Sequence, residues 1–127
     1  MKIKSIMQFV IIKFLAVLRR ANLIAQQADA LIAEANELSN AAEQEFQYGK
    51  TAMDLTRETG NKFFATVARW HYQQCLVKYR LAAAKFYEAG KLTVDQNRRH
   101  DLEIELQEIS KYARYVELSV AAVTNPA

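Results

Sequence analysis

Residues 1–42 read MKIKSIMQFVIIKFLAVLRRANLIAQQADALIAEANELSNAA. Apolar residues recur there at alternating steps of four and three positions, and no member of this series is polar. The series, called the stripe below, is Ile3, Met7, Val10, Phe14, Val17, Ala21, Ile24, Ala28, Leu31, Ala35, Leu38 and Ala42. A seven-residue apolar repeat of this length predicts one helix that presents a single face to a partner helix. From Ala21 onward Ala alternates with Ile or Leu, which predicts close antiparallel packing.

The rest of the chain predicts two further helices with apolar stripes of their own. The second runs from about residue 62 to 89, with Ala65, Ala68, Tyr72, Cys75, Tyr79, Ala82, Phe86 and Ala89 on its stripe. The third runs from about residue 94 to 123, with Leu102, Leu106, Ile109, Ala113, Val116, Val120 and Val123.

Glycine and threonine mark the expected ends of these helices. We expect the first helix to pass through Gly49, either straight or bent, and to end near residue 58, where Gly60 supplies a left-handed cap. Gly90 is expected to end the second helix in the same way. Thr93 with Gln96 resembles a capping box and predicts the start of the third helix there.

The composition agrees with a single helical domain. The 127 residues are 51% apolar and 24% charged, so the chain is long enough and apolar enough to fold. Three glycines and one proline are too few for a turn-rich sandwich or barrel. We therefore predict an all-α fold, a three-helix antiparallel coiled-coil-like bundle with a long N-terminal helix extending beyond it. Residues 1–25 would form the N-terminal extension, residues 26–123 the bundle and residues 124–127 a frayed tail.

Charge is segregated along the chain. Residues 1–20 hold five bases and no acid, residues 21–60 seven acids and two bases, residues 61–92 six bases and one acid, and residues 93–127 six acids and four bases. We favour packing of neighbouring segments beside each other, so that opposite charges neutralise. The alternative is a basic face left over for an anionic partner.

The N-terminal extension is the strongest candidate site. At ~1.5 Å per residue the second and third helices span roughly 40–45 Å, against ~80 Å for the first. The bundle would therefore use about residues 28–58 of the first helix and leave the earlier residues uncovered. The candidate interface is Met7, Val10, Ile11, Phe14, Leu15, Val17 and Leu18, and its basic flank is Lys2, Lys4, Lys13, Arg19 and Arg20.

Four interpretations of the extension compete. Against a cleaved signal peptide, Lys13 interrupts the apolar run, and Arg19 and Arg20 stand where a small-residue cleavage site belongs. A membrane span needs about 20 apolar residues, which this run does not reach. An interfacial amphipathic anchor fits the basic flank, because Lys and Arg reach anionic headgroups. Self-association or insertion into a partner protein fits the unbroken heptad repeat, and we favour it.

A nucleic-acid face is a further candidate. The second helix carries Arg69, Lys78, Arg80 and Lys85, interleaved with four aromatic residues, Trp70, Tyr72, Tyr79 and Tyr87. Basic and aromatic side chains together can contact phosphates and stack on bases. Tyr72 and Tyr79 belong to the apolar stripe, however, so a basic helix packed against an acidic one is the favoured interpretation.

No pattern in the sequence predicts catalysis, and we expect no enzyme, no cofactor and no metal site. Cys75 is the only cysteine and lies on a stripe, so a buried, inert thiol is expected. His71, four residues before it, is the one group that could activate it, while His100 is expected at a boundary or the surface. The acids Glu34, Glu37, Glu43, Glu45, Glu103, Glu105 and Glu108 are expected to be solvated.

Residues 60–118 resemble the helical repeats of tetratricopeptide and microtubule-interacting-and-trafficking domains. Ala and Tyr recur along residues 63–89, and residues 109–114, ISKYAR, have a similar cadence. The Trp, Leu, Gly and Tyr tetrad of the former repeats and their 34-residue self-similarity are missing. The resemblance therefore implies helices and assigns no functional residue.

Together these patterns predict a non-enzymatic assembly or adaptor protein. It would oligomerise or dock onto a protein partner through its N-terminal amphipathic helix. The alternatives are a peripheral membrane-binding protein anchored by residues 1–20, and a basic helical protein that binds nucleic acid. The lone cysteine suggests a reducing, intracellular compartment, with membrane association or membership of a large assembly as further options.

Overall fold

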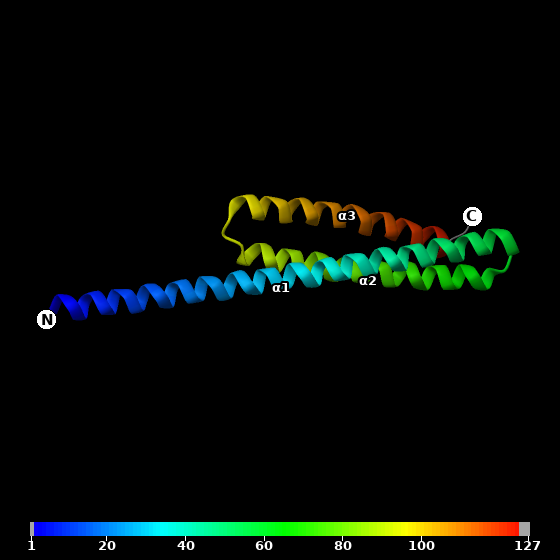
Figure 1. Ribbon diagram of the computed structural model, residues 1–127. Helices are drawn as coiled ribbons and strands as arrows, with labels where there is room; N and C mark the ends of the chain where they lie inside the picture. The colour runs from blue at the N-terminus through cyan, green and yellow to red at the C-terminus, as the bar shows by residue number, and fades with distance from the viewer. Residues whose placement is uncertain (1, 125–127) are drawn as a thin grey trace.

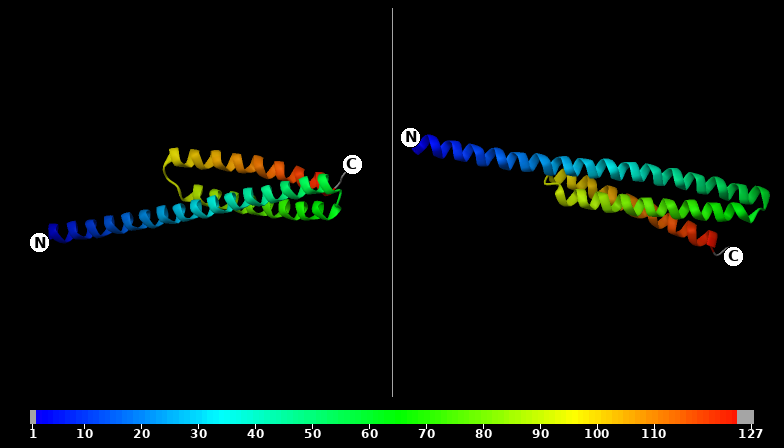
Figure 2. Two further views of the ribbon diagram at one scale, coloured as in Figure 1. Left: turned by 45° about the vertical axis from the view of Figure 1, so that its right-hand side comes forward. Right: turned by 90° about the horizontal axis from the view of Figure 1, so that it is seen from below.

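A computed structural model describes residues 2–124, which form three helices and no strand: α1 (Lys2–Thr59), α2 (Lys62–Leu92) and α3 (Gln96–Thr124) (Figure 1). α1 and α2 form an antiparallel hairpin, and α3 turns back along α2. α1 is 58 residues long and continues beyond the bundle as a straight helix (Figure 2). The predicted all-α three-helix bundle with a long N-terminal helix is confirmed.

Small residues at seven-residue spacing hold α1 and α2 together. On α1 the buried positions include Ala28, Ala35, Ala42 and Gly49, and on α2 they include Ala68, Cys75, Ala82 and Ala89. α1 continues through Gly49, and the missing side chain of this residue makes room for Tyr72 of α2. A Cβ atom there would lie 2.5 Å from Cε1 of Tyr72. The two backbones can therefore approach closely along the whole hairpin.

α3 packs mainly against α2 and leans away from α1 (Figures 1 and 2). Leu102, Ile109 and Val116 are its buried residues, again seven positions apart, and they join a core that includes Phe86 of α2. The remaining residues of the predicted third stripe pack partly buried around this core. Because α2 lies between its neighbours, a groove remains open between α1 and α3.

The turn between α1 and α2 follows the prediction. Gly60 has a φ of +68°, in the left-handed region, and its N–H donates to the Thr56 carbonyl at 2.9 Å. Asn61 then caps α2, because its Oδ1 accepts the N–H of Phe63 at 3.0 Å.

The predicted turn between α2 and α3 was wrong in detail. α2 passes through Gly90 to Leu92, and the Thr93 hydroxyl closes it by donating to the Ala89 carbonyl at 2.7 Å. Asp95 caps α3 in place of Thr93, since its Oδ1 accepts the N–H of Asn97 at 3.0 Å. Aspartate is the stronger N-cap of the two residues, and its position moves the start of α3 to Gln96.

The pairing register of α1 and α2 decides where the bundle begins. Glu45 binds Lys78 and Glu34 binds Lys85, so residue numbers rise on one helix as they fall on the other. Leu92, the last residue of α2, lines the same pocket as Ala28, the first buried residue of α1. Residues before Ala28 therefore lie beyond the end of α2. Of the predicted tail, Thr124 is the last residue of α3, and residues 125–127 lie outside the described part, as does Met1.

Candidate interaction surface

Every described residue of the N-terminal extension, from residue 2 to residue 25, is exposed. Thirteen large apolar side chains lie between Ile3 and Ile24, with exposed fractions of 41% to 75%. They are Ile3, Ile6, Met7, Phe9, Val10, Ile11, Ile12, Phe14, Leu15, Val17, Leu18, Leu23 and Ile24. All seven residues of the predicted interface are among them. Monomeric proteins rarely leave an apolar surface of this extent in water.

The stripe of the extension lies on the same face of α1 that meets α2 in the bundle. Within the bundle Ala28, Ala35 and Ala42 repeat at seven-residue spacing and are buried. In the extension the equivalent positions are Met7, Phe14 and Ala21, and the first two are large. The face thus continues, but side-chain size grows where α2 ends. A partner of the extension would therefore pack at a wider spacing than α2 does.

The five bases of the extension have no acid on their own segment, because the first acid of the chain is Asp29. Lys13 places its Nζ 4.8 Å from the ring centroid of Phe9, which is a cation–π contact. Asp29 itself pairs with Arg98 at the start of α3. The extension therefore presents an uncompensated positive charge beside its apolar surface.

The bases of α2, unlike those of the extension, pair with carboxylates. Lys78 pairs with Glu45 at 3.0 Å, Lys85 with Glu34 at 2.7 Å and Arg80 with Glu117 at 3.0 Å. Three of the four residues of the candidate nucleic-acid face are thus engaged by carboxylates of α1 and α3. Arg69 is the fourth and is half-buried. Neighbouring segments of opposite charge do pack together in the structure.

Glu45 is the centre of a polar cluster that sequence reasoning missed, since it was expected to be solvated. Its side chain is only 15% exposed and bridges His71 Nδ1 at 2.6 Å and Lys78 Nζ at 3.0 Å. Burial raises the pKa of Glu45, but the hydrogen bonds with His71 and Lys78 outweigh it and leave the pKa below its usual value. The alternation of charged segments was the signal, because it predicts acids of the first helix facing bases of the second.

Cys75 is buried, and His71, four residues before it, pairs with a different side chain. Burial, followed by the nearby Glu45 charge, raises the pKa of the Cys75 thiol to about 12, so it stays protonated. His71 binds Glu45 and not Cys75, and its ring lies 5.0 Å from that of Trp70. His100 is exposed near the start of α3. Within residues 2–124 no group of three or more His, Cys, Asp or Glu residues could hold a metal ion.

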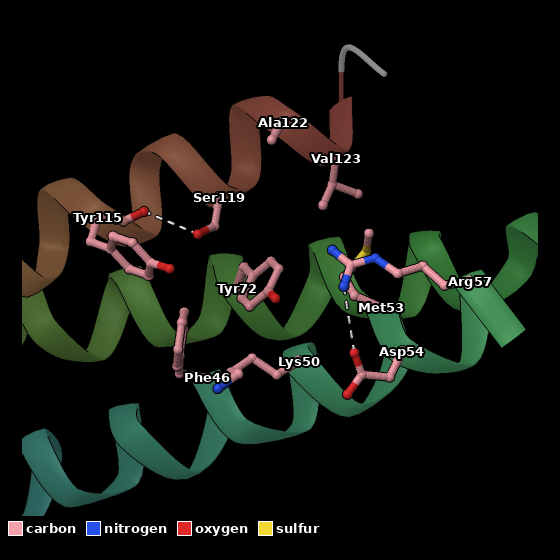
Figure 3. Close-up of a pocket in the computed structure, with 10 residues that line it drawn as sticks. All are labelled: Phe46, Lys50, Met53, Asp54, Arg57, Tyr72, Tyr115, Ser119, Ala122 and Val123. Atoms are coloured by element: carbon pink, nitrogen blue, oxygen red, sulfur yellow. Dashed lines mark hydrogen bonds and ion pairs between the residues drawn. The ribbon is translucent and has the colours of Figure 1, made fainter. Parts of the chain in front are cut away.

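The groove between α1 and α3 is lined by aromatic side chains. Figure 3 shows Phe46 of α1, Tyr72 of α2 and Tyr115 of α3, which line a hollow of about 240 Å³. The Phe46 ring lies 5.4 Å from Tyr72 and 5.7 Å from Tyr115. A neighbouring hollow of about 540 Å³ lies over Tyr79. Helical stripes do not reveal such a groove, because they predict which face packs and not how far α3 leans.

A third hollow, here called the junction pocket, lies where the extension meets the bundle. Its volume is about 380 Å³, and its lining is mostly apolar. The lining residues are Ala21, Ile24, Ala25 and Ala28 of α1, and Leu92, Thr93, Val94, Asp95 and Arg98 around the α2–α3 connection. Val94 is 89% exposed, the most of any large apolar residue described. The stripe of the extension therefore leads directly into this pocket.

None of the helices described between residues 2 and 124 is both long enough and apolar enough to cross a membrane. No protein-family model, curated protein or solved structure matches this chain.

Proposed function

We propose that this is a non-enzymatic assembly or adaptor protein that docks through its N-terminal extension onto copies of itself or onto another protein. The observation that carries the proposal is the exposure of thirteen large apolar side chains on a helix that leaves its own bundle. The buried, protonated thiol of Cys75 and the pairing of His71 with Glu45 favour a role without catalysis.

The energetics favour a partner for the extension. Burial of one large apolar side chain contributes roughly 1.5–3 kcal/mol, so covering even a third of these residues offsets much of the cost of association. Repulsion between exposed like charges on neighbouring helices costs only about 0.2–0.5 kcal/mol per pair. The apolar term is therefore the larger one. The heptad spacing of Ile3, Met7, Val10 and Phe14 favours a helix as the partner.

A peripheral membrane-binding role is the second candidate. It is supported by the five bases, Lys2, Lys4, Lys13, Arg19 and Arg20, with no acid before Asp29. Each such base near an anionic membrane surface contributes about 1 kcal/mol. Nucleic-acid binding has less support, because carboxylates of α1 and α3 engage Lys78, Arg80 and Lys85.

The test is to place carboxylates on the exposed stripe of the full chain, with Val10→Asp and Phe14→Asp together. Both residues are exposed in the single chain, so the bundle should fold normally. The mass in solution, measured by light scattering without detergent, should fall to that of one chain. Leu118→Asp on α3 is the matched control, because it charges an equally exposed apolar residue outside the extension.

The remaining outcomes decide between the candidates. A wild-type mass of one chain, together with flotation on anionic vesicles that salt weakens, supports the membrane role. An unchanged mass in the double variant contradicts docking through the extension.

A further inference from the structure

We propose that the partner of the extension is the extension of a second copy, which lies antiparallel along the same stripe. The two chains then form a symmetric dimer, with the first turn of α1 in each copy at the junction pocket of the other. This inference rests on the proposed function and names its partner. Four features of the molecule support it: the exposed face of α1, the end of α2, the junction pocket and the distribution of charge.

The direction of pairing follows from the face that the stripe occupies. In the bundle that face is covered by α2 from Ala28 onward. A second extension running parallel would continue along α1 into the space that α2 fills. An antiparallel extension lies in line with α2 and begins where α2 ends, near Leu92. Only the antiparallel arrangement lets one face of α1 contact α2 in the bundle and the second copy in the extension.

The pairing register of the two extensions follows from the requirement that each extension covers the exposed stripe of the other. With Phe14 opposite Val17 of the second copy, Val10 lies opposite Ala21 and Met7 opposite Ile24, while Ile3 reaches the buried Ala28 where α2 ends. Each exposed stripe residue from Met7 to Ile24 then has a counterpart. A shift of one heptad in one direction uncovers Ile24, and a shift in the other drives the first turn of α1 against Leu92.

The junction pocket suits the first turn of a second α1. It offers about 380 Å³ lined by Ala21, Ala25 and Ala28, so the space is apolar and bounded by small side chains. Lys4 of the second copy flanks the stripe and arrives beside Ala25, close to Asp95. The Asp95 carboxylate already accepts one backbone N–H and remains available to a cation. Charge at the ends of the dimer is thus complementary.

Charge in the middle of the dimer is not complementary, and this gives the arrangement a distinctive signature. Lys13 and Arg20 flank the stripe one heptad apart, so each Lys13 faces Arg20 of the other copy. Arg19 lies on the opposite side of the helix, away from the stripe. Because each extension carries five bases and no acid, repulsion between the two extensions exceeds the attraction at the ends, so salt should strengthen the dimer. An anionic membrane surface requires the reverse, because salt weakens its attraction for these bases.

Charge reversal at Lys13 in the full chain tests this arrangement. Lys13→Glu replaces two repulsive contacts with attractive ones, so the dimer Kd measured by sedimentation at low salt should fall by about tenfold. Arg19→Glu is the matched control with the same change in net charge, and its Kd should stay within about twofold of wild type. Equal Kd values for the two variants, or a higher value for Lys13→Glu, would overturn the arrangement.

Cysteine cross-linking tests the direction independently, since the native Cys75 is buried. Chains with Val10→Cys should form disulfides with chains carrying Ala21→Cys, and not with their own kind. Self-linked Val10→Cys chains would indicate parallel pairing and overturn the inference. If the stripe carboxylates abolish assembly but no mixed disulfide forms, docking stands and this geometry falls. A wild-type chain that stays monomeric and floats with anionic vesicles overturns both proposals.

Discussion

The two halves of α1 carry the same repeat and meet different surroundings. From Ala28 to Gly49 every seventh residue is Ala or Gly, α2 covers the stripe, and the acids Glu34 and Glu45 bind bases of α2. Before Ala28 the stripe carries Phe14 and Met7, its face is exposed, and the bases have no acidic neighbour on their segment. The repeat thus gives both halves a contact face, while side-chain size and charge determine which partner can occupy it.

The largest difference should come from one substitution made in each half. Ala35→Asp places an unpaired carboxylate in a fully buried site between α1 and α2 and should destabilise the protein by more than about 3 kcal/mol. Ala21→Asp, at an exposed stripe position, should change the free energy of unfolding by less than about 0.5 kcal/mol. Urea denaturation at a protein concentration low enough for monomers measures both. Similar losses at the two sites would mean that the halves do not differ as described.

The next effect concerns close approach inside the bundle. Gly49→Ala forces a Cβ atom against the Tyr72 ring, 2.5 Å away, and should destabilise the protein by about 1–3 kcal/mol. Gly90→Ala is the control, because Gly90 is helical in the last turn of α2 and a Cβ there meets nothing within 4 Å. It should stabilise the protein by about 0.5–1 kcal/mol. Thermal unfolding of both variants should therefore shift in opposite directions, and a gain for Gly49→Ala would rule out the tight contact.

A smaller effect should follow from the Glu45 cluster. Because the pKa of Glu45 is lower in the folded chain, its ion pairs stabilise the protein above about pH 4.5, and this contribution is lost as pH falls through the folded pKa. Glu45→Gln should cost about 1 kcal/mol at neutral pH and flatten the decline in stability as pH falls below about 4.5. Glu37→Gln is the control, since Glu37 is exposed. An unchanged pH dependence in Glu45→Gln would show that the cluster contributes nothing.

Removal of most of the extension should have the smallest effect on the free energy of unfolding. Removal of residues 2–20 takes away exposed helix and no buried side chain, so the bundle should unfold at nearly the same denaturant concentration. Assembly size or vesicle binding should fall at the same time. Unfolding of the shortened chain as a monomer would mean that the extension belongs to the core.

Much of this structure can be predicted from patterns that depend on one helix at a time. The buried residues Tyr72, Tyr79 and Phe86 follow from seven-residue spacing, and the positive φ of Gly60 follows from its position after the stripe. Features that depend on two neighbours were missed. Gly90 stays helical because Thr93 and Asp95 provide the ends, and Glu45 is shielded by the bases of α2.

The candidate interaction surface also has a part that the sequence predicts and a part that it does not. The apolar residues of the extension and its basic flank can be read from the sequence, because they depend on composition and spacing alone. The junction pocket and the aromatic groove cannot be, because each depends on where α2 ends or on how far α3 leans from α1.

Amide hydrogen exchange of the full chain shows most directly whether another chain covers the extension. The exchange rates of residues 2–25 are measured over a range of protein concentrations without lipid. Because an isolated exposed helix opens readily, these amides should exchange fast at low concentration. Protection should rise steeply with concentration, while the amides of residues 28–58 stay protected throughout. Rapid exchange along residues 2–25 at every concentration would contradict the proposal that another chain covers this part of α1.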